Sequence, residues 1–199
     1  MLALTTRTLA TSHRSVVAVK RPLLTHYRQF LASSSSTEIT EATWYTTPPA
    51  ELHTVCECLC ILRGAIPPPP AGVPEAGDGR VPTPWPTLKR IMSRYDFKSW
   101  LASMSTSVAS IDIVNARRVE NIIRMDATIT YERLRDVSMA GYRLLIIVAA
   151  ALQSVTLLDE IATSKAELTA FEAKYDRARK FLFAVGGLHL LPPPATVDR

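Results

Sequence analysis

Residues 87–191 contain no proline, and the only glycines among them are Gly141, Gly186 and Gly187. Proline clashes with the preceding helical turn and lacks a backbone N–H, and glycine adds conformational freedom, so both residues tend to interrupt helices. A stretch of this length with so few interrupting residues predicts almost continuous helix. We therefore expect a mainly α protein, in which long helices form a hairpin or a bundle over residues 87–191.

Residues 67–86 have the opposite composition, with eight prolines and three glycines. Four successive prolines favour the polyproline II conformation, which has no internal hydrogen bonds. We expect a semi-rigid linker at these positions rather than part of a core. The linker separates a short N-terminal segment, residues 38–66, from the helical domain, and residues 192–199 form a short tail after that domain.

Two signals predict where helices begin and end inside the helical domain. Pro84 and Pro86 end the linker, so that Thr87 is placed to cap the first helix. The serine-rich stretch 103–110 predicts a turn, because serine hydroxyls compete for nearby backbone groups. We expect a second helix to begin near Ser110.

Residues 137–158 carry a single charge, Arg143. A helix of this length measures about 33 Å, which is close to the ~30 Å hydrocarbon thickness of a bilayer. Arg143 would lie near one end of such a helix, from which its long side chain can reach the lipid headgroups. The segment is therefore a candidate membrane span.

The same segment also fits the buried central helix of a soluble bundle. Its apolar and small side chains recur in alternating steps of three and four, and this pattern continues through the charged residues 159–183. Such spacing is typical of a coiled-coil seam, which needs a partner helix. A membrane helix that continues as a coiled coil outside the bilayer would show it as well. The seam comprises Ile147, Ala150, Ser154, Leu157, Ile161, Ser164, Leu168, Phe171, Tyr175, Ala178 and Leu182.

The positive charge of the chain is concentrated at its start. The net charge is +5, yet residues 1–37 hold five basic residues and no acidic one, so the remaining residues are balanced. Because residues 38–199 have no net charge, they produce no net field that would attract a phosphate backbone, and we expect no nucleic-acid partner. Residues 1–37 are also rich in serine and threonine, and four arginines recur every seven residues, on one face of a helix. This composition is typical of a disordered mitochondrial transit peptide; a chloroplast peptide or a basic tail would share it.

The end of that segment resembles the two-step processing pattern of mitochondrial precursors, through Arg28, Phe30 and Ser33. The resemblance implies a first cut after residue 29 and a second cut after Thr37. The mature chain would then begin at Glu38, the first acidic residue. We therefore expect a protein of the mitochondrial inner membrane or matrix.

All three cysteines lie close to one histidine, as His53, Cys56, Cys58 and Cys60. Thiolates and imidazole are ligands for zinc and copper(I). On a strand the three sulfurs would share one face, whereas on a helix Cys58 would point away from the other two. The sequence has no second ligand pair, so a metal site would be transient or shared between two copies. The alternative is that the cysteines fill an apolar patch.

The sequence contains no glycine-rich phosphate loop and no hydrolase or metalloprotease motif. Glu132 and Asp136 could form a carboxylate pair on a helix, and Arg117 with Arg118 could contact an anionic lipid headgroup. A solvated helix face is the favoured explanation of both pairs. We therefore expect a protein without enzymatic activity and without a resident cofactor.

Three functions follow from these patterns. The first is an imported mitochondrial accessory or assembly protein that acts by helix–helix interaction at the inner membrane. The second is a soluble helical-bundle adaptor in the matrix. The third is a metal or redox carrier that uses His53 and the cysteines. The expected partner is a protein of a mitochondrial complex, or a second copy, bound through the seam over residues 147–182.

Overall fold

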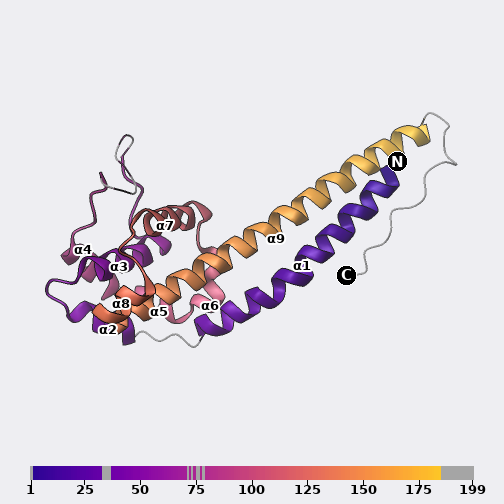
Figure 1. The fold of residues 1–199 in the computed structure, drawn as a ribbon. Helices are drawn as coiled ribbons and strands as arrows, with labels where there is room; N and C mark the ends of the chain where they lie inside the picture. The colour runs from indigo at the N-terminus through magenta and orange to yellow at the C-terminus, as the bar shows by residue number, and fades with distance from the viewer. Residues whose placement is uncertain are drawn as a thin grey trace. The chain divides into compact units, whose positions relative to one another are not determined.

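The computed structural model describes residues 2–32, 37–70, 72, 74, 77 and 79–184, which form helices and loops without a strand (Figure 1). The mainly α class expected from the sequence is confirmed. A 3₁₀ turn, η1 (Val108–Ser110), follows α6. The α-helices of the described residues are α1 (Leu2–Ala32), α2 (Thr37–Trp44), α3 (Ala50–Leu62), α4 (Trp85–Met92), α5 (Tyr95–Ala102), α6 (Met104–Ser107), α7 (Ile113–Met125), α8 (Tyr131–Val137) and α9 (Met139–Ala184).

The chain divides into two compact units. Unit 1 contains Met1–Leu24 and Leu157–Arg199, and unit 2 contains Thr25–Thr156. In the order of the chain, unit 2 is therefore inserted between the two halves of unit 1. The long helices α1 and α9 each contribute residues to both units.

The described part of unit 1 is an antiparallel pair of helices, formed by the first part of α1 and the last part of α9 (Figure 1). Nδ1 of His13 and Oγ of Ser164 lie 3.0 Å apart in a hydrogen bond. Seven residues further along α1, about two helical turns, Lys20 forms an ion pair with Glu160. The residue number on α9 falls as the number on α1 rises, so the two helices run in opposite directions.

The last part of α9 is shielded from solvent along one stripe. Between residues 161 and 181, only every third or fourth side chain is partly or fully buried, and Tyr175 is the most buried of them. These positions are those of the seam expected from the sequence, and α1 lies along them. The side chain of Leu182 lies outside the described part. The shielded positions are Ile161, Ser164, Leu168, Phe171, Tyr175 and Ala178.

The start of the chain, expected to be a disordered presequence, is helical as α1. Its shielded side chains recur at helical spacing and give the helix a face that can pair with α9. Of the four regularly spaced arginines, Arg14 and Arg21 are exposed and Arg28 is partly shielded, and α1 continues through Pro22. Residues 33–36 lie outside the described part. The shielded side chains of α1 within unit 1 are His13, Val16, Val17, Lys20 and Leu24.

Unit 2 is built around α3, which packs mainly against α7 and α4. All but two of its residues are buried. The first turns of α9 also enter this core, since a methyl group added at Gly141 would lie 3.2 Å from Cδ1 of Leu52 on α3. Its fully or almost fully buried side chains include Leu52, Val55, Leu59, Leu88, Met92, Leu101, Val119, Ile122, Leu134, Leu144, Val148 and Ala151.

The helix limits differ from the expected ones for local reasons. Thr87 does not cap the first helix after the linker, because Pro84 occupies the N-cap position and the helix begins at Trp85. Pro86 lies in the first turn of this helix. Proline is well suited to that turn, because backbone N–H groups there have no carbonyl partner within the helix. The second helix begins at Ile113 rather than near Ser110, and its cap is Asp112, whose carboxylate accepts a hydrogen bond from the N–H of Val114.

The apolar segment of α9 is half enclosed by protein. The helix Met139–Phe181 is long and apolar enough to cross a membrane, and half of its most apolar window is buried inside the protein. Between residues 140 and 157, the exposed side chains are Arg143, Gln153 and Thr156, which are all polar. Arg143, expected to reach for headgroups, instead forms an ion pair of 3.5 Å with Glu38.

Candidate functional site

The cysteine cluster lies on α3, which decides between the strand and the helix that the sequence left open. The helix places Cys56 and Cys60 four residues apart on one side, and Cys58 points in another direction. All three cysteines are free thiols without solvent exposure. Within the residues that the structure describes, no three metal-ligating side chains come together.

Burial makes these thiols hard to ionise. Desolvation raises the pKa of Cys56 far above its ordinary value, and it raises the pKa values of Cys58 and Cys60 to about 12. The thiolate is the form that binds metals and attacks disulfides. A buried cysteine held as the neutral thiol behaves as a small apolar side chain that fills the core.

The fourth residue of the expected metal set, His53, faces a different environment. It is half-buried and lies beside Trp85, with their ring centroids 5.8 Å apart. Desolvation lowers the pKa of His53 more than the nearby carboxylate of Glu57 raises it, so that the imidazole is neutral at pH 7. His53 lines a pocket, whereas the three cysteines lie in the core.

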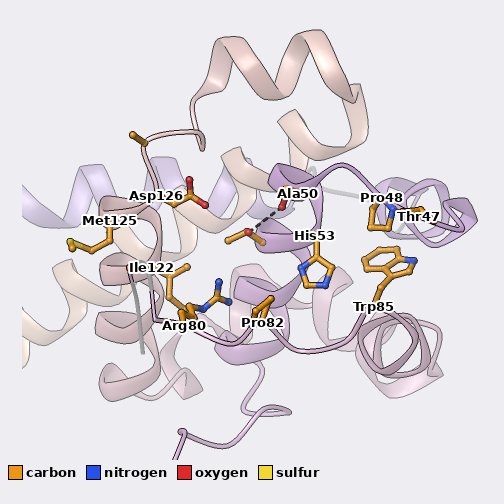
Figure 2. A pocket seen from close by; sticks show the side chains of 13 residues that line it. Thr47, Pro48, Ala50, His53, Arg80, Pro82, Trp85, Ile122, Met125 and Asp126 are labelled. Carbon is orange, nitrogen blue, oxygen red and sulfur yellow. Dashed lines mark hydrogen bonds between the residues drawn. The ribbon is translucent and has the colours of Figure 1, made fainter. Parts of the chain in front are cut away.

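This pocket has a volume of about 760 Å³ and lies between α3, the end of α7 and the loop before α4. Figure 2 shows His53, Pro48 and Trp85 on one side of it, with Met125 and Asp126 on the other. Arg80, from the loop, lies between the two sides (Figure 2). The pocket thus joins residues from three separate parts of the sequence.

Glu57 fastens the loop to α3 from inside. Its side chain is 3% exposed and forms an ion pair with Arg80, whose side chain is 15% exposed. Its Oε1 accepts hydrogen bonds from the N–H and the hydroxyl of Thr83, at 2.9 and 2.7 Å. Buried charges are stable when they are paired and fully hydrogen-bonded in this way.

The proline-rich stretch is therefore anchored near both ends. At its start, Nη1 of Arg118 on α7 donates hydrogen bonds to the carbonyl oxygens of Ile66 and Pro67, at 3.2 and 3.0 Å. Near its end, the indole N–H of Trp85 donates a hydrogen bond to the carbonyl of Tyr45, at 3.0 Å. The expected linker joins two parts of unit 2 and is held against both of them.

The remaining candidate residues lie on helix surfaces or at helix ends. Glu132 and Asp136 are both exposed on α8, and Arg117 is exposed beside Arg118 on α7. Of the expected processing residues, Arg28 and Phe30 belong to α1, Thr37 begins α2, and Ser33 lies outside the described residues. Leu31, between the two expected cuts, is fully buried.

The sequence interpretation did not identify Glu57, Arg80 or Asp126 as residues of a site. One signal was available for Glu57, because an acid inside the apolar run "VCECLCIL" needs an internal partner if that run is buried. Nothing in the sequence around Arg80 or Asp126 sets either residue apart. A comparison with models of protein families finds no match, and neither does a comparison with curated proteins.

Proposed function

We propose that this protein is a non-enzymatic interaction protein, a helical adaptor whose unit 2 binds a protein partner and whose unit 1 links it to an assembly. The observation that carries the proposal is the antiparallel pair in unit 1. The seam side chains of α9 are shielded, and His13 and Lys20 of α1 contact the same helix. Paired helices of this kind are stiff connecting elements, and they contribute no chemistry of their own.

The burial of α9 favours the soluble adaptor over the inner-membrane subunit. A helix in lipid presents apolar side chains outward, whereas the exposed positions between residues 140 and 157 are Arg143, Gln153 and Thr156. Carbonate extraction of cells that express the chain tests this choice. We expect the protein in the supernatant, and recovery in the membrane pellet would favour the inner-membrane subunit.

Import into mitochondria remains a prediction from the composition of residues 1–37. Cleavage after residue 29 would remove the helix that α1 contributes to unit 1, and cleavage after Thr37 would also remove the fully buried Leu31. We propose instead that α1 stays in the working protein as a structural helix. Sequencing of the N-terminus of the protein recovered from its native compartment distinguishes the two, since a start at residue 30 or 38 would show that α1 is discarded.

The adaptor function predicts a stable protein partner. Full-length protein cross-linked in extract of the native organism should be recovered with the same partner at a constant ratio. A variant with Leu168→Asp and Tyr175→Asp should lose the partners that need unit 1. It should keep the partners of unit 2, because both substituted residues belong to the helix pair of unit 1. Recovery of the chain alone at low and moderate salt would contradict the adaptor proposal.

A further inference from the structure

Among the described residues that line the pocket beside α3, one negative charge is unmatched. The charge of Arg80 is matched by Glu57, and the half-buried His53 is neutral at pH 7. Asp126 is the other charged residue of the lining within the part of the chain that the structure describes. Its Oδ1 accepts hydrogen bonds from the N–H and the hydroxyl of Thr128, at 3.0 and 2.6 Å, and no described residue donates a hydrogen bond to Oδ2.

Beside the remaining N–H groups of Arg80, the described lining of the pocket offers hydrogen-bond acceptors. In the neutral ring of His53, one nitrogen carries the hydrogen and the other is an acceptor. The hydroxyl of Thr54 already donates its hydrogen to the carbonyl of Ala50, at 3.1 Å (Figure 2). A guest that brings hydrogen-bond donors and a positive charge would therefore be complementary to the pocket.

The walls of the pocket suit the stem of a long side chain. Ile122 and Trp85 are almost fully buried and form apolar surface, and Pro82 lies between them in the lining. Met125 is 59% exposed at the rim, so that its flexible thioether can close over a guest. Long basic side chains combine an apolar stem with a charged end, and the planar guanidinium group of arginine also stacks on aromatic rings.

We propose that this pocket binds an arginine side chain of a partner protein, with the guanidinium group against Asp126 and His53 and the stem against Ile122 and Met125. The proposal rests on the proposed function, because the arginine belongs to the protein that unit 2 binds. It adds the chemistry of recognition and names the surface of unit 2 that takes part.

The test uses full-length protein and the peptide acetyl-Ala-Ala-Arg-Ala-Ala-amide as the probe. Nuclear magnetic resonance follows the indole N–H of Trp85 and the ring of His53 during titration, which gives both the place of binding and the dissociation constant. The same peptide with citrulline is the matched control, because citrulline keeps the shape of arginine without its charge. We expect the arginine peptide to bind about tenfold more tightly than the citrulline peptide.

Two variants and one control variant decide the outcome. Asp126→Asn keeps an oxygen that accepts hydrogen bonds from Thr128 but removes the charge. The affinity of this variant for the arginine peptide should fall to the affinity of the unsubstituted protein for the citrulline peptide. Met125→Ala removes the thioether from the rim and should weaken binding about threefold. Asp136→Asn, on exposed α8, should change nothing. Equal binding by Asp126→Asn, or signals that shift outside the pocket, would overturn the proposal, while recovery of a protein partner from extract would still support the adaptor function.

Discussion

Glu57 on α3 and Arg80 in the loop before α4 form an ion pair that is almost completely removed from solvent. They are 23 residues apart in the sequence, and the pair closes the proline-rich stretch onto the core of unit 2. A buried carboxylate that loses its partner is left as an uncompensated charge, and a buried guanidinium group is left in the same condition.

We predict that Glu57→Gln lowers the free energy of unfolding by about 3 kcal/mol, because Arg80 then remains buried without a counter-charge. Urea unfolding followed by circular dichroism measures the change. The double variant Glu57→Gln with Arg80→Met should be less destabilised than the two single changes added together. If Glu57→Gln unfolded at the same urea concentration as the exposed control Glu120→Gln, the ion pair would have no stabilising role.

Gly141 should not tolerate a larger residue, although it lies within α9. A methyl group at this position would lie 2.8 Å from Cδ2 of Leu134 and 3.2 Å from Cδ1 of Leu52. Alanine favours helix over glycine by about 1 kcal/mol, but crowding in a close-packed core costs about 1–3 kcal/mol. We expect Gly141→Ala to lower the melting temperature, and to raise it in a Leu134→Ala background, where the clashing atom is absent. A stabilised single variant would show that α9 lies further from Leu134 and Leu52.

The three buried cysteines should react slowly with thiol reagents until unit 2 unfolds. The pKa values of Cys58 and Cys60 are about 12, so the reactive thiolate is scarce in the folded protein at pH 8. Ellman's reagent should label less than one thiol per chain in buffer and all three in guanidinium chloride. Rapid labelling of the folded protein would contradict the burial of the cluster.

The same pKa shifts predict how stability depends on pH. The thiols of the unfolded chain ionise near pH 9, whereas those of Cys58 and Cys60 in the folded protein keep their protons to about pH 12. Between these values the unfolded state binds fewer protons, so the free energy of unfolding falls as the pH rises. The Cys58→Ala variant should show a smaller fall above pH 9 than the unsubstituted protein, and equal slopes would argue against these shifts.

The seam of unit 1 can be tested by a substitution at its most buried position. Tyr175 is 2% exposed, and Tyr175→Ala should remove about 3 kcal/mol of stability from the helix pair. We expect limited proteolysis to cut within residues 157–184 of this variant at lower protease concentration. The neighbouring Lys174→Ala, which alters an exposed side chain, is the matched control. Equal cleavage of both variants would show that the seam does not hold α9 in place.

Local patterns predicted much of the helical structure. The absence of proline predicted the helices of the second half, and steps of three and four residues predicted which face of α9 is shielded, down to Leu168 and Tyr175. These features depend on neighbours along the chain, so a single sequence contains them. The helix limits at Trp85 and Ile113 were missed by two or three residues, because proline and aspartate competed with threonine and serine as caps.

Contacts between distant residues could not be predicted in the same way. The seam of α9 indicated that a partner helix was needed, but nothing in the sequence identified α1 as that helix. The composition of residues 1–37, with arginine, serine and no acidic residue, is typical of a targeting signal. An amphipathic helix that stays in the protein can have the same composition, so composition alone does not distinguish the two. The pocket was missed for a similar reason, since His53, Arg80 and Asp126 meet only after α3, the loop and α7 have packed together.

The central claim is that α1 is a structural helix paired with α9, and a disulfide tests it most directly. In full-length protein, His13→Cys with Ser164→Cys replaces two side chains that now touch, and the buried native cysteines should not compete. Mild oxidation should give an intramolecular disulfide, seen by mass spectrometry and by faster migration in a non-reducing gel, whereas His13→Cys with the exposed Thr163→Cys should not. Failure of the first pair to cross-link, or cross-linking only between two chains, would contradict the pairing of α1 with α9.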